Sequence, residues 1–283
     1  MRLITEARSL LFVPATSPHL LAKAAARGAD ALIVDLEDAV PLDRKVQARQ
    51  MAAQAIRQLA EQASVLVRVN AAPELLRADI EALPLDRVQG VLLPKVESPA
   101  QLVLAAQLLA RHGGSVGDTP PVPLAALIET PLGVLRAEGI ATAHPTLVAL
   151  GFGAEDYASE MRIAPRPDAL QWAAQTVANC ARAFGLACWG LPGSVAEIDD
   201  MAAFAELVRR ARDIGFSGTV CIHPRQVPVA NAGFAPTEDE LLWAQRVVAA
   251  AQQARSQGLG AISLDGRMID RPVLERAKRL IHP

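Results

Sequence analysis

The sequence alternates short apolar runs with longer helix-forming segments along almost its whole length. Each run stops at Pro, Gly or a polar residue, a pattern typical of strands buried on both faces. There are about eight such units, and no Gly-rich dinucleotide fingerprint follows the first one. Alternation of this length predicts a parallel sheet covered by helices, and closure into a (β/α)8 TIM barrel is its simplest form. An open doubly wound sheet is the alternative. The strand-like runs are Leu10–Pro14, Ala31–Asp35, Val65–Asn70, Val91–Lys95, Leu124–Ile128, Leu147–Phe152, Leu186–Trp189 and Thr219–Ile222.

The last part of the chain lies beyond the eighth unit. We therefore predict a barrel domain over residues 1–258 and a C-terminal extension over residues 259–283. The extension contains a turn at Leu264–Met268 and a helical stretch at Val273–Ile281. We expect it to pack over the barrel mouth or against a neighbouring subunit.

Composition excludes several classes of protein. The net charge is −2 with acids and bases interspersed, which argues against binding to nucleic acid or to an anionic membrane. No apolar run approaches the roughly 18 residues of a membrane span, and the run near the start is too short for a signal peptide. The three cysteines lack zinc-site spacing and suit a reducing compartment. The sequence thus predicts a soluble, cytoplasmic protein.

Two neighbouring apolar runs end in carboxylates. Glu129 follows the run at Leu124–Ile128, and Asp156 follows the run at Leu147–Phe152. Residues just past the strands of a barrel emerge at its carboxyl-terminal mouth, where active sites form. Two carboxylates delivered there by adjacent strands can share a hard cation such as Mg²⁺. The alternative is that each acid simply caps a helix.

Other polar residues stand beside the remaining strands. A divalent cation at such a rim suits enolate chemistry on a 2-oxo acid, because it takes up developing negative charge. Arg68 can pair with a substrate carboxylate in a bidentate manner, although neutralisation of Glu129 or Asp35 is an equal alternative. Besides these, the strand-flanking polar residues are Arg8, Glu37, Asp38, Asn70, Lys95, Glu97, Glu155 and His223.

Lys95 and Asp265 each have a competing structural interpretation. A strand-end lysine in a barrel can form a Schiff base. The carboxylates expected around Lys95 would keep it protonated, so ion pairing is favoured. Asp265 belongs to an Asp-Gly turn, where Asp commonly makes local hydrogen bonds.

Eight segments in this order resemble the citrate lyase beta-subunit family, within the wider HpcH/HpaI aldolase group that includes malyl-CoA and citramalyl-CoA lyases. The resemblance extends from about Arg8 to Ile281. The segments are Arg8–Pro14, Asp35–Val40, Val67–Asn70, Leu93–Ser98, Leu127–Thr130, Gly153–Asp156, Ile222–Pro224 and Leu264–Met268.

The resemblance implies a Mg²⁺-dependent TIM barrel that cleaves or forms a carbon–carbon bond in a 3-hydroxyacyl thioester. Glu129 and Asp156 match the metal-binding carboxylates. Arg68 and Glu129 match positions that contact the 2-oxo acid, and the backbone around Ala154, Glu155 and Asp156 closes on its carboxylate. The resemblance implies a homotrimer or a dimer of trimers, with acyl-CoA or an acyl carrier protein thioester as the second substrate. Further implied roles are a substrate-proximal base at Arg8, water-holding acids at Glu37 and Asp38, and an acid that handles the acetyl proton, supplied by an adjacent subunit, at Asp265.

Two departures from the family concern the thioester half. This chain has Ala15–Pro18 after the first strand and Trp189-Gly190 at the seventh, where relatives often carry other residues. The leading hypothesis is a lyase of citryl-, citramalyl- or malyl-type thioesters, yielding oxaloacetate, pyruvate or glyoxylate plus acetyl thioester. The alternatives are a metal-dependent aldolase of free hydroxy-oxo acids, a citrate lyase beta subunit active only with partner subunits, and imine chemistry at Lys95.

Overall fold

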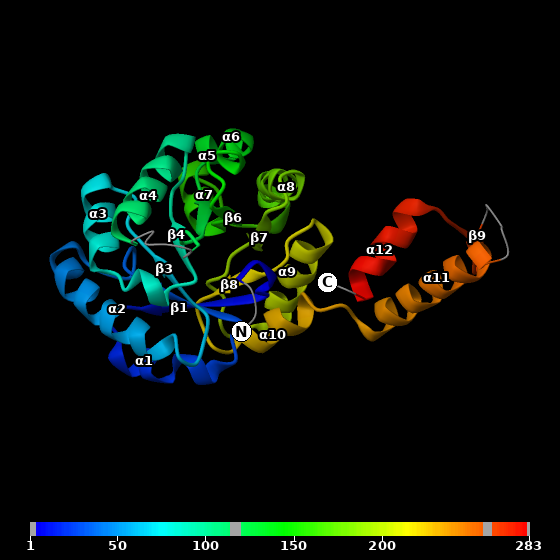
Figure 1. Ribbon diagram of the computed structural model, residues 1–283, viewed down its shortest axis with the longest axis horizontal. Helices are drawn as coiled ribbons and strands as arrows, with labels where there is room; N and C mark the ends of the chain where they lie inside the picture. The colour runs from blue at the N-terminus through cyan, green and yellow to red at the C-terminus, as the bar shows by residue number, and fades with distance from the viewer. Residues whose placement is uncertain (1–3, 114–119, 257–261, 282–283) are drawn as a thin grey trace. The chain divides into compact units, whose positions relative to one another are not determined.

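Eight parallel strands form one sheet that closes on itself (Figure 1). The computed structural model describes residues 4–113, 120–256 and 262–281. The first strand pairs with both the second and the eighth, and the strand order otherwise follows the chain. A bridge between Trp189 and Gly218 links the two ends of the sheet. The predicted barrel is therefore confirmed, and the doubly wound alternative is wrong. The strands are β1 (Ser9–Pro14), β2 (Ala31–Asp35), β3 (Val65–Arg68), β4 (Gly90–Leu93), β5 (Leu124–Ile128), β6 (Leu147–Phe152), β7 (Ala187–Gly190) and β8 (Thr219–Cys221).

The strands are buried on both faces because successive side chains point to opposite sides. Leu10, Ile33 and Leu66 belong to an apolar cluster in the barrel interior, which is formed by alternate residues of the strands. Their neighbours Leu11 and Val34 belong to the larger cluster between the sheet and the helices. Because both faces of each strand are buried, the strand sequences are apolar at successive positions.

Helices of the first compact unit, Met1–Phe234, surround the strands (Figure 1). Several begin with Pro in the first turn, where the missing N–H costs nothing. They are α1 (Pro18–Ala24), α2 (Lys45–Leu59), α3 (Pro73–Ala82), α4 (Pro99–His112), α5 (Pro131–Leu135), α6 (Ala137–Ala141), α7 (Ala154–Met161), α8 (Pro167–Ala183), α9 (Met201–Asp213) and α10 (Gln226–Gly233).

The second compact unit, Ala235–Pro283, is larger than the predicted extension. It contains α11 (Glu238–Ser256), β9 (Ile262–Leu264), β10 (Arg267–Ile269) and α12 (Arg271–Ile281). Ala244, Val247, Ile269 and Ala277 form its core. The Arg276 guanidinium lies 4.5 Å from the centre of the Trp243 ring.

The predicted domain boundary at 258 therefore needs correction. The predicted barrel domain includes α11 as the helix after the eighth strand. That place is occupied by α10, whose weakly patterned sequence escaped notice. Because α11 buries its apolar face against α12, it belongs to the second unit. Packing of the extension over the mouth or against a neighbouring subunit stays a prediction.

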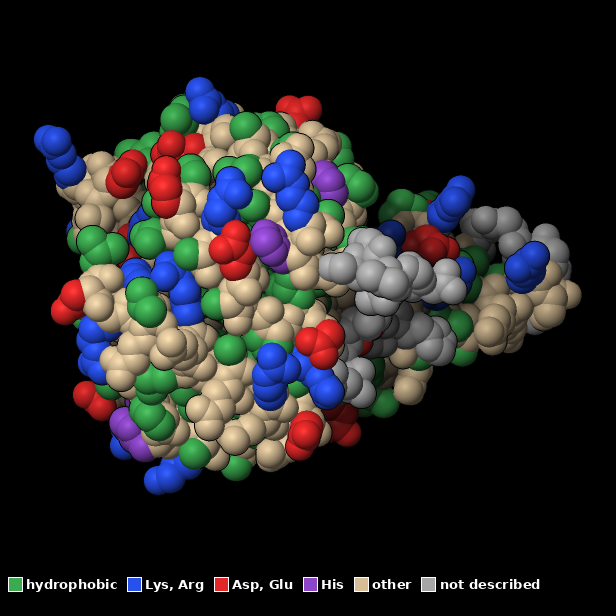
Figure 2. All heavy atoms as spheres, turned by 60° about the vertical axis from the view of Figure 1, so that its left-hand side comes forward, with side chains coloured by type: hydrophobic (Ala, Val, Ile, Leu, Met, Phe, Trp, Pro, Cys, Tyr) green, Lys and Arg blue, Asp and Glu red, His purple; other side chains and the backbone are tan. Residues whose placement is uncertain are grey.

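The distribution of charge on the surface and the polarity of the helices agree with the expectations from composition. Figure 2 shows acidic and basic side chains interspersed on the face that it presents, with no extended patch of one sign. Among the described residues, no helix is both long and apolar enough to cross a bilayer.

Candidate active site

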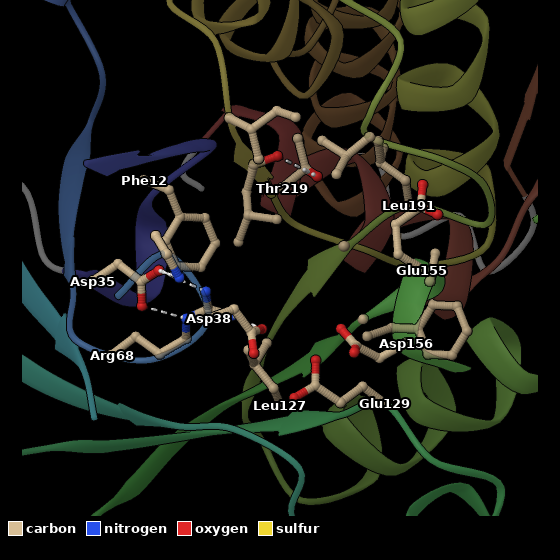
Figure 3. Close-up of a pocket in the computed structure, with 18 of the residues that line it drawn as sticks. Phe12, Asp35, Asp38, Arg68, Leu127, Glu129, Glu155, Asp156, Leu191 and Thr219 are labelled. Carbon is tan, nitrogen blue, oxygen red and sulfur yellow. Dashed lines mark hydrogen bonds and ion pairs between the residues drawn. The ribbon is translucent and has the colours of Figure 1, made fainter. Parts of the chain in front are cut away.

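A cavity of about 450 Å³ opens at the carboxyl ends of the barrel strands (Figure 3). This is the end at which barrel enzymes place their chemistry, because the βα loops converge there. One part of the lining carries acids and one arginine, and another part is apolar. The charged lining residues are Asp35, Asp38, Arg68, Glu129, Glu155 and Asp156, and the larger apolar ones are Phe12, Leu127, Phe152, Leu191, Val195, Val220 and Ile222.

Glu129 and Asp156 are the centre of the acidic part. Figure 3 shows their carboxylates side by side in the cavity. Glu129 is only 2 % exposed, and its Oε1 accepts a hydrogen bond from the Lys95 backbone N–H at 2.7 Å. Burial, reinforced by the charge of Asp156, raises the pKa of Glu129 to about 7. A buried pair that repels itself in this way is suited to a divalent cation, which would favour ionisation of both groups.

The helix-capping alternative for these acids is wrong. Thr130, not Glu129, caps α5, and its Oγ1 accepts from Gly133 N at 3.0 Å. Gly153 occupies the N-cap position of α7, so Asp156 lies inside the first turn. Among the described residues, no group of three or more His, Cys, Asp and Glu side chains could hold a metal. A cation held by this pair would therefore complete its coordination with water or substrate, as Mg²⁺ commonly does.

Helix α7 was not predicted, yet it places three of the candidate residues. The helix begins directly at Ala154, two residues after β6 ends. Ala154 and Asp156 both line the cavity. Glu155 also lines it, but its carboxylate accepts a hydrogen bond from the Ser194 hydroxyl of the loop after β7. Glu155 and Asp156 lie in the first turn of α7, where the helix dipole stabilises negative charge.

Gly153 is required for the position of Glu129, and the sequence analysis missed it. A Cβ at position 153 would lie 2.4 Å from Glu129 Oε2 and 2.6 Å from its Cβ. Real Cβ atoms do not approach so closely, so any side chain here would displace the carboxylate. In the sequence, the only indication of this role for Gly153 was its place in the Gly-Ala-Glu-Asp segment.

Arg68 fulfils one of the two roles that the sequence left open, the neutralisation of a nearby acid. Its Nε and Nη2 both donate to Asp35 at 2.7 Å, so it does neutralise Asp35. Its Nη1 lies 3.1 Å from Glu37 and 3.3 Å from Asp38, and its guanidinium lies 4.6 Å from the centre of the Phe12 ring. Burial alone would lower the pKa of Arg68, but the bond to Asp35 and the surrounding acids raise it. Arg68 therefore stays charged. Because Arg68 also lines the cavity and Asp35 takes one N–H of Nη2, the other N–H of Nη2 is available to a ligand.

Lys95 forms ion pairs, as the sequence analysis favoured. Its Nζ lies 2.5 Å from Glu37 and 3.1 Å from Asp38. Burial lowers the pKa of Lys95, but these two hydrogen bonds outweigh it and raise the pKa overall. A permanently protonated amine cannot attack a ketone, which argues against imine chemistry. The backbone of Lys95 has φ 51°, a left-handed conformation that a lysine adopts only at some cost.

Glu37 and Asp38 behave as a coupled pair. Burial, together with the hydrogen bond to Asp38, raises the pKa of Glu37. The pKa of Asp38 is lowered although burial opposes this, because Glu37 and Lys95 both hydrogen bond to its carboxylate. Of the two, only Asp38 lines the cavity. A proton shared by the pair would therefore reside mainly on Glu37.

A buried lysine holds the loop that carries these acids, and sequence reasoning missed it. Lys45 Nζ donates to the carbonyls of Leu36 and Glu37, both at 2.7 Å. Asn70 Nδ2 donates to the same Leu36 carbonyl at 3.0 Å, and Asn70 is in turn held by the fully buried Asp79. No motif signals these contacts, because they join residues that lie between 8 and 34 positions apart in the chain.

The structure does not bring Arg8 to the cavity, and this prediction needs correction. Arg8 precedes β1, and its backbone N–H and Nε both bond to Asp30, which precedes β2. A six-residue strand spans about 20 Å, so a residue before it lies at the opposite end of the barrel from a residue after it. Arg8 is accordingly absent from the cavity lining.

Neither Asp265 nor His223 is among the residues that line the cavity. Asp265 belongs to the second unit, in the exposed turn between β9 and β10, with φ 52°. Its carboxylate accepts from Arg246 Nη2 at 2.7 Å. His223 does not line the cavity, and its Nδ1 accepts from the backbone N–H of Arg225.

Comparison with known proteins identifies the family. The model of the HpcH/HpaI aldolase/citrate lyase family matches residues 8–224. The chain belongs to this family. Its curated relatives include the citrate lyase subunit beta of Leuconostoc mesenteroides, 34 % identical with 97 % of this chain and 92 % of the relative covered. The (3S)-malyl-CoA thioesterase of Cereibacter sphaeroides is 36 % identical, with 93 % and 89 % covered.

A solved relative supports the same assignment. It is protein CitE from Mycobacterium tuberculosis in complex with magnesium, acetoacetate and coenzyme A, with a TM-score of 0.76 and 34 % identity over 97 % of this chain and 96 % of that one. The family is one of aldolases and lyases, so the predicted carbon–carbon lyase is confirmed at this level.

Proposed function

We propose that this lyase is Mg²⁺-dependent and cleaves a citryl-, citramalyl- or malyl-type thioester to a 2-oxo acid and an acetyl thioester. The observation that carries the proposal is the Glu129–Asp156 pair beside Arg68 in one cavity. Relatives support it, since structures of M. tuberculosis relatives hold magnesium with oxaloacetate in one case and magnesium with pyruvate in another.

Each residue of the cavity has a distinct role in the proposal. Glu129 and Asp156 hold the cation, which when bound stabilises negative charge on the oxygens of the 2-oxo acid. Arg68 donates to the substrate carboxylate, and the backbone N–H groups around Ala154–Asp156 face it from the start of α7. Asp38 and Glu37 accept hydrogen bonds from waters beside the pair.

In the cleavage direction the 3-hydroxyl loses its proton, the carbon–carbon bond breaks, and the released thioester enolate takes up a proton. We assign the first proton to the Glu37–Asp38 pair, by way of water, because this pair lies against both Arg68 and Lys95. We assign delivery of the second proton to Asp265 from the C-terminal unit of a neighbouring subunit in a homotrimer. Because the Asp265 carboxylate is paired with Arg246, Asp265 first takes a proton from solvent and then passes it to the enolate.

The reaction is tested by mass spectrometry on purified protein. Citryl-, citramalyl- and malyl-CoA are incubated with Mg²⁺, with an EDTA-treated sample as control. Cleavage releases acetyl-CoA plus a 2-oxo acid, whereas hydrolysis, the activity named in the Cereibacter relative, releases free CoA with the hydroxy acid intact. Cleavage of a free hydroxy-oxo acid without CoA would favour the aldolase alternative. Turnover only after addition of partner subunits would favour the citrate lyase complex.

Magnesium affinity is expected to fall with acidity. Because the pKa of Glu129 is about 7 in the metal-free protein, the cation must displace a proton below that pH. The dissociation constant should be nearly constant above pH 8 and rise by about tenfold between pH 8 and pH 6. Isothermal titration at four pH values measures this, and a flat profile through pH 6 would contradict it.

Replacing Asp265 with Asn is expected to lower kcat by about 10²- to 10⁴-fold while 2-oxo acid binding is retained, because only proton delivery is lost. Asp239→Asn, on the exposed surface of α11, is the matched control and should be fully active. Mixing Asp265→Asn with an inactive Glu129→Gln variant should restore part of the activity if the acid acts between subunits. Full activity of Asp265→Asn alone would remove this residue from the mechanism.

A further inference from the structure

The backbone of Lys95 takes a conformation that most side chains avoid. Its φ of 51° lies in the left-handed region, which glycine enters freely and a lysine enters only at a cost. Among the described residues, the other non-glycine residues with positive φ are Arg162 at the end of α7 and Asp265 in the β9–β10 turn. Helix ends and turns are the usual places for this conformation. Lys95 instead lies in a bend between β4 and α4, so its conformation needs another explanation.

The bend turns one N–H group out of the strand ladder and toward Glu129. Strand β4 stays paired with β5 up to Leu93, and the next bond of the ladder is donated by the Val96 N–H. Between them, the Lys95 N–H donates instead to Oε1 of Glu129 at 2.7 Å. Because Pro94 has no N–H, Lys95 is the one residue between Leu93 and Val96 that can donate to Glu129.

The side chain of Lys95 makes a second, separate set of contacts. Its Nζ lies 2.5 Å from Glu37 and 3.1 Å from Asp38. Lys95 thus contacts a proposed metal ligand through its backbone and the proposed proton-accepting pair through its ammonium. Because each contact uses a different part of the residue, substitution can separate them.

Gln101 holds the bend from the first turn of α4. Its Nε2 donates to the Lys95 carbonyl at 3.2 Å, and its Oε1 accepts from the N–H groups of the two residues before α4, at 2.8 and 3.0 Å. Helix α5 closes the other side, since a Cβ at Gly133 would lie 2.6 Å from the Val96 carbonyl oxygen. A costly conformation persists where its surroundings fix it in this way.

We propose that Lys95 is a positioning residue with two separable functions: its left-handed backbone sets the Glu129 carboxylate for Mg²⁺, and its ammonium holds the Glu37–Asp38 pair. The inference rests on the proposed function, since it concerns the same metal pair. A side chain that cannot adopt the left-handed conformation should withdraw the N–H from Glu129 and weaken metal binding. Loss of the ammonium alone should affect proton transfer and leave metal binding nearly unchanged.

Two substitutions at this position isolate the backbone. Lys95→Gly and Lys95→Val both remove the ammonium, but glycine keeps the left-handed conformation and the branched valine strongly disfavours it. Mg²⁺ alone is titrated calorimetrically into the metal-free proteins at pH 8. We expect Lys95→Gly to bind within about threefold of the unaltered protein, and Lys95→Val at least about tenfold more weakly than Lys95→Gly.

Arg162→Val is the matched control for the backbone. Arg162 has φ 57° and is exposed outside the cavity lining, so valine meets the same backbone penalty there without adjoining Glu129. Each valine variant should lower the melting temperature, by about 2–6 °C. Only Lys95→Val should lose Mg²⁺ affinity.

A further variant tests the bend with Lys95 intact. Gln101→Leu removes the hydrogen bonds that hold the bend, and we expect it to weaken Mg²⁺ binding by about three- to tenfold. Gln107→Leu, on the exposed face of α4, is its control and should bind Mg²⁺ as the unaltered protein does. If Lys95→Val does not fold, this pair decides, and unaltered binding by both variants would overturn the proposal.

The ammonium is tested by turnover with saturating Mg²⁺. Lys95→Gly should lower kcat by at least about tenfold, while the KM for the thioester changes by less than about threefold, because only proton transfer is affected. An unchanged kcat would overturn the function assigned to the ammonium.

The outcomes separate the two proposals. Equal Mg²⁺ affinity of Lys95→Gly and Lys95→Val, or equal weakening by Lys95→Val and Arg162→Val, would overturn the role of the backbone and leave the proposed function standing. Failure of the unaltered protein to bind Mg²⁺ would overturn the proposed function and this inference with it.

Discussion

Replacing Glu129 with Gln is expected to lower kcat/KM by at least about 10³-fold, because one of two charges that hold the cation is lost. The same change should leave the metal-free protein as stable or more so at pH 8. The pKa of Glu129 is raised from 4.5 to about 7 by folding, so its ionised form opposes folding above pH 4.5. That opposition amounts to roughly 3 kcal/mol at pH 8 and disappears in the Gln variant. Glutamine still accepts the hydrogen bond from Lys95 N.

The combined signature separates a lost metal site from a misfolded protein. Thermal unfolding is measured with and without Mg²⁺ beside the activity assay. The unaltered enzyme should gain stability on addition of Mg²⁺, and Glu129→Gln should not. Asp156→Asn should lose activity in the same way. Glu160→Gln, on the exposed side of α7, is the control and should behave as the parent does. Normal turnover of Glu129→Gln would refute the metal pair.

Replacing Gly153 with Ala is expected to lower kcat/KM by about 10²-fold, although no charged group changes. The new Cβ would approach the carboxylate and Cβ of Glu129 to 2.4 and 2.6 Å, so the side chain must move. A displacement of about 1 Å in a catalytic group is enough for such a loss. Magnesium affinity should fall in parallel, and this is measured by titration.

A second glycine serves as the matched control for this substitution. Gly139 lies in α6, and a Cβ there would meet Pro99 Cγ at 3.7 Å, an ordinary contact. Gly139→Ala should therefore keep full activity and gain up to about 1 kcal/mol of stability from its higher helix propensity. If Gly153→Ala bound Mg²⁺ and turned over normally, the close fit around Glu129 would not matter for function.

The predictions that succeeded rest on local patterns. Runs such as Ala31–Asp35 are apolar throughout because both faces of a barrel strand are buried, and that pattern is visible without a structure. Glu129 was placed correctly for the same reason, since a residue just after a strand must emerge at one known end. The short helices α7 and α10 offered no such signal. Both are short, and α10 lacks a clear polar face.

The errors came from positions that depend on the third dimension. Arg8 was grouped with the rim because it adjoins a strand, although it adjoins the wrong end. The domain boundary was misplaced because packing of α11 against α12 joins segments that the chain alone does not connect.

Strand and helix periodicity was therefore readable from the amino acids in order, because it depends on neighbours within a few residues. The family was readable because eight short segments occur in a fixed order along the chain. Only the tertiary structure determined the hydrogen-bond partners of Arg68 and the hydrogen bonds from Lys45 to the loop that carries Glu37 and Asp38. It alone also determined the short distance between position 153 and Glu129. These contacts join residues separated by many positions, and their distances follow from how the barrel closes.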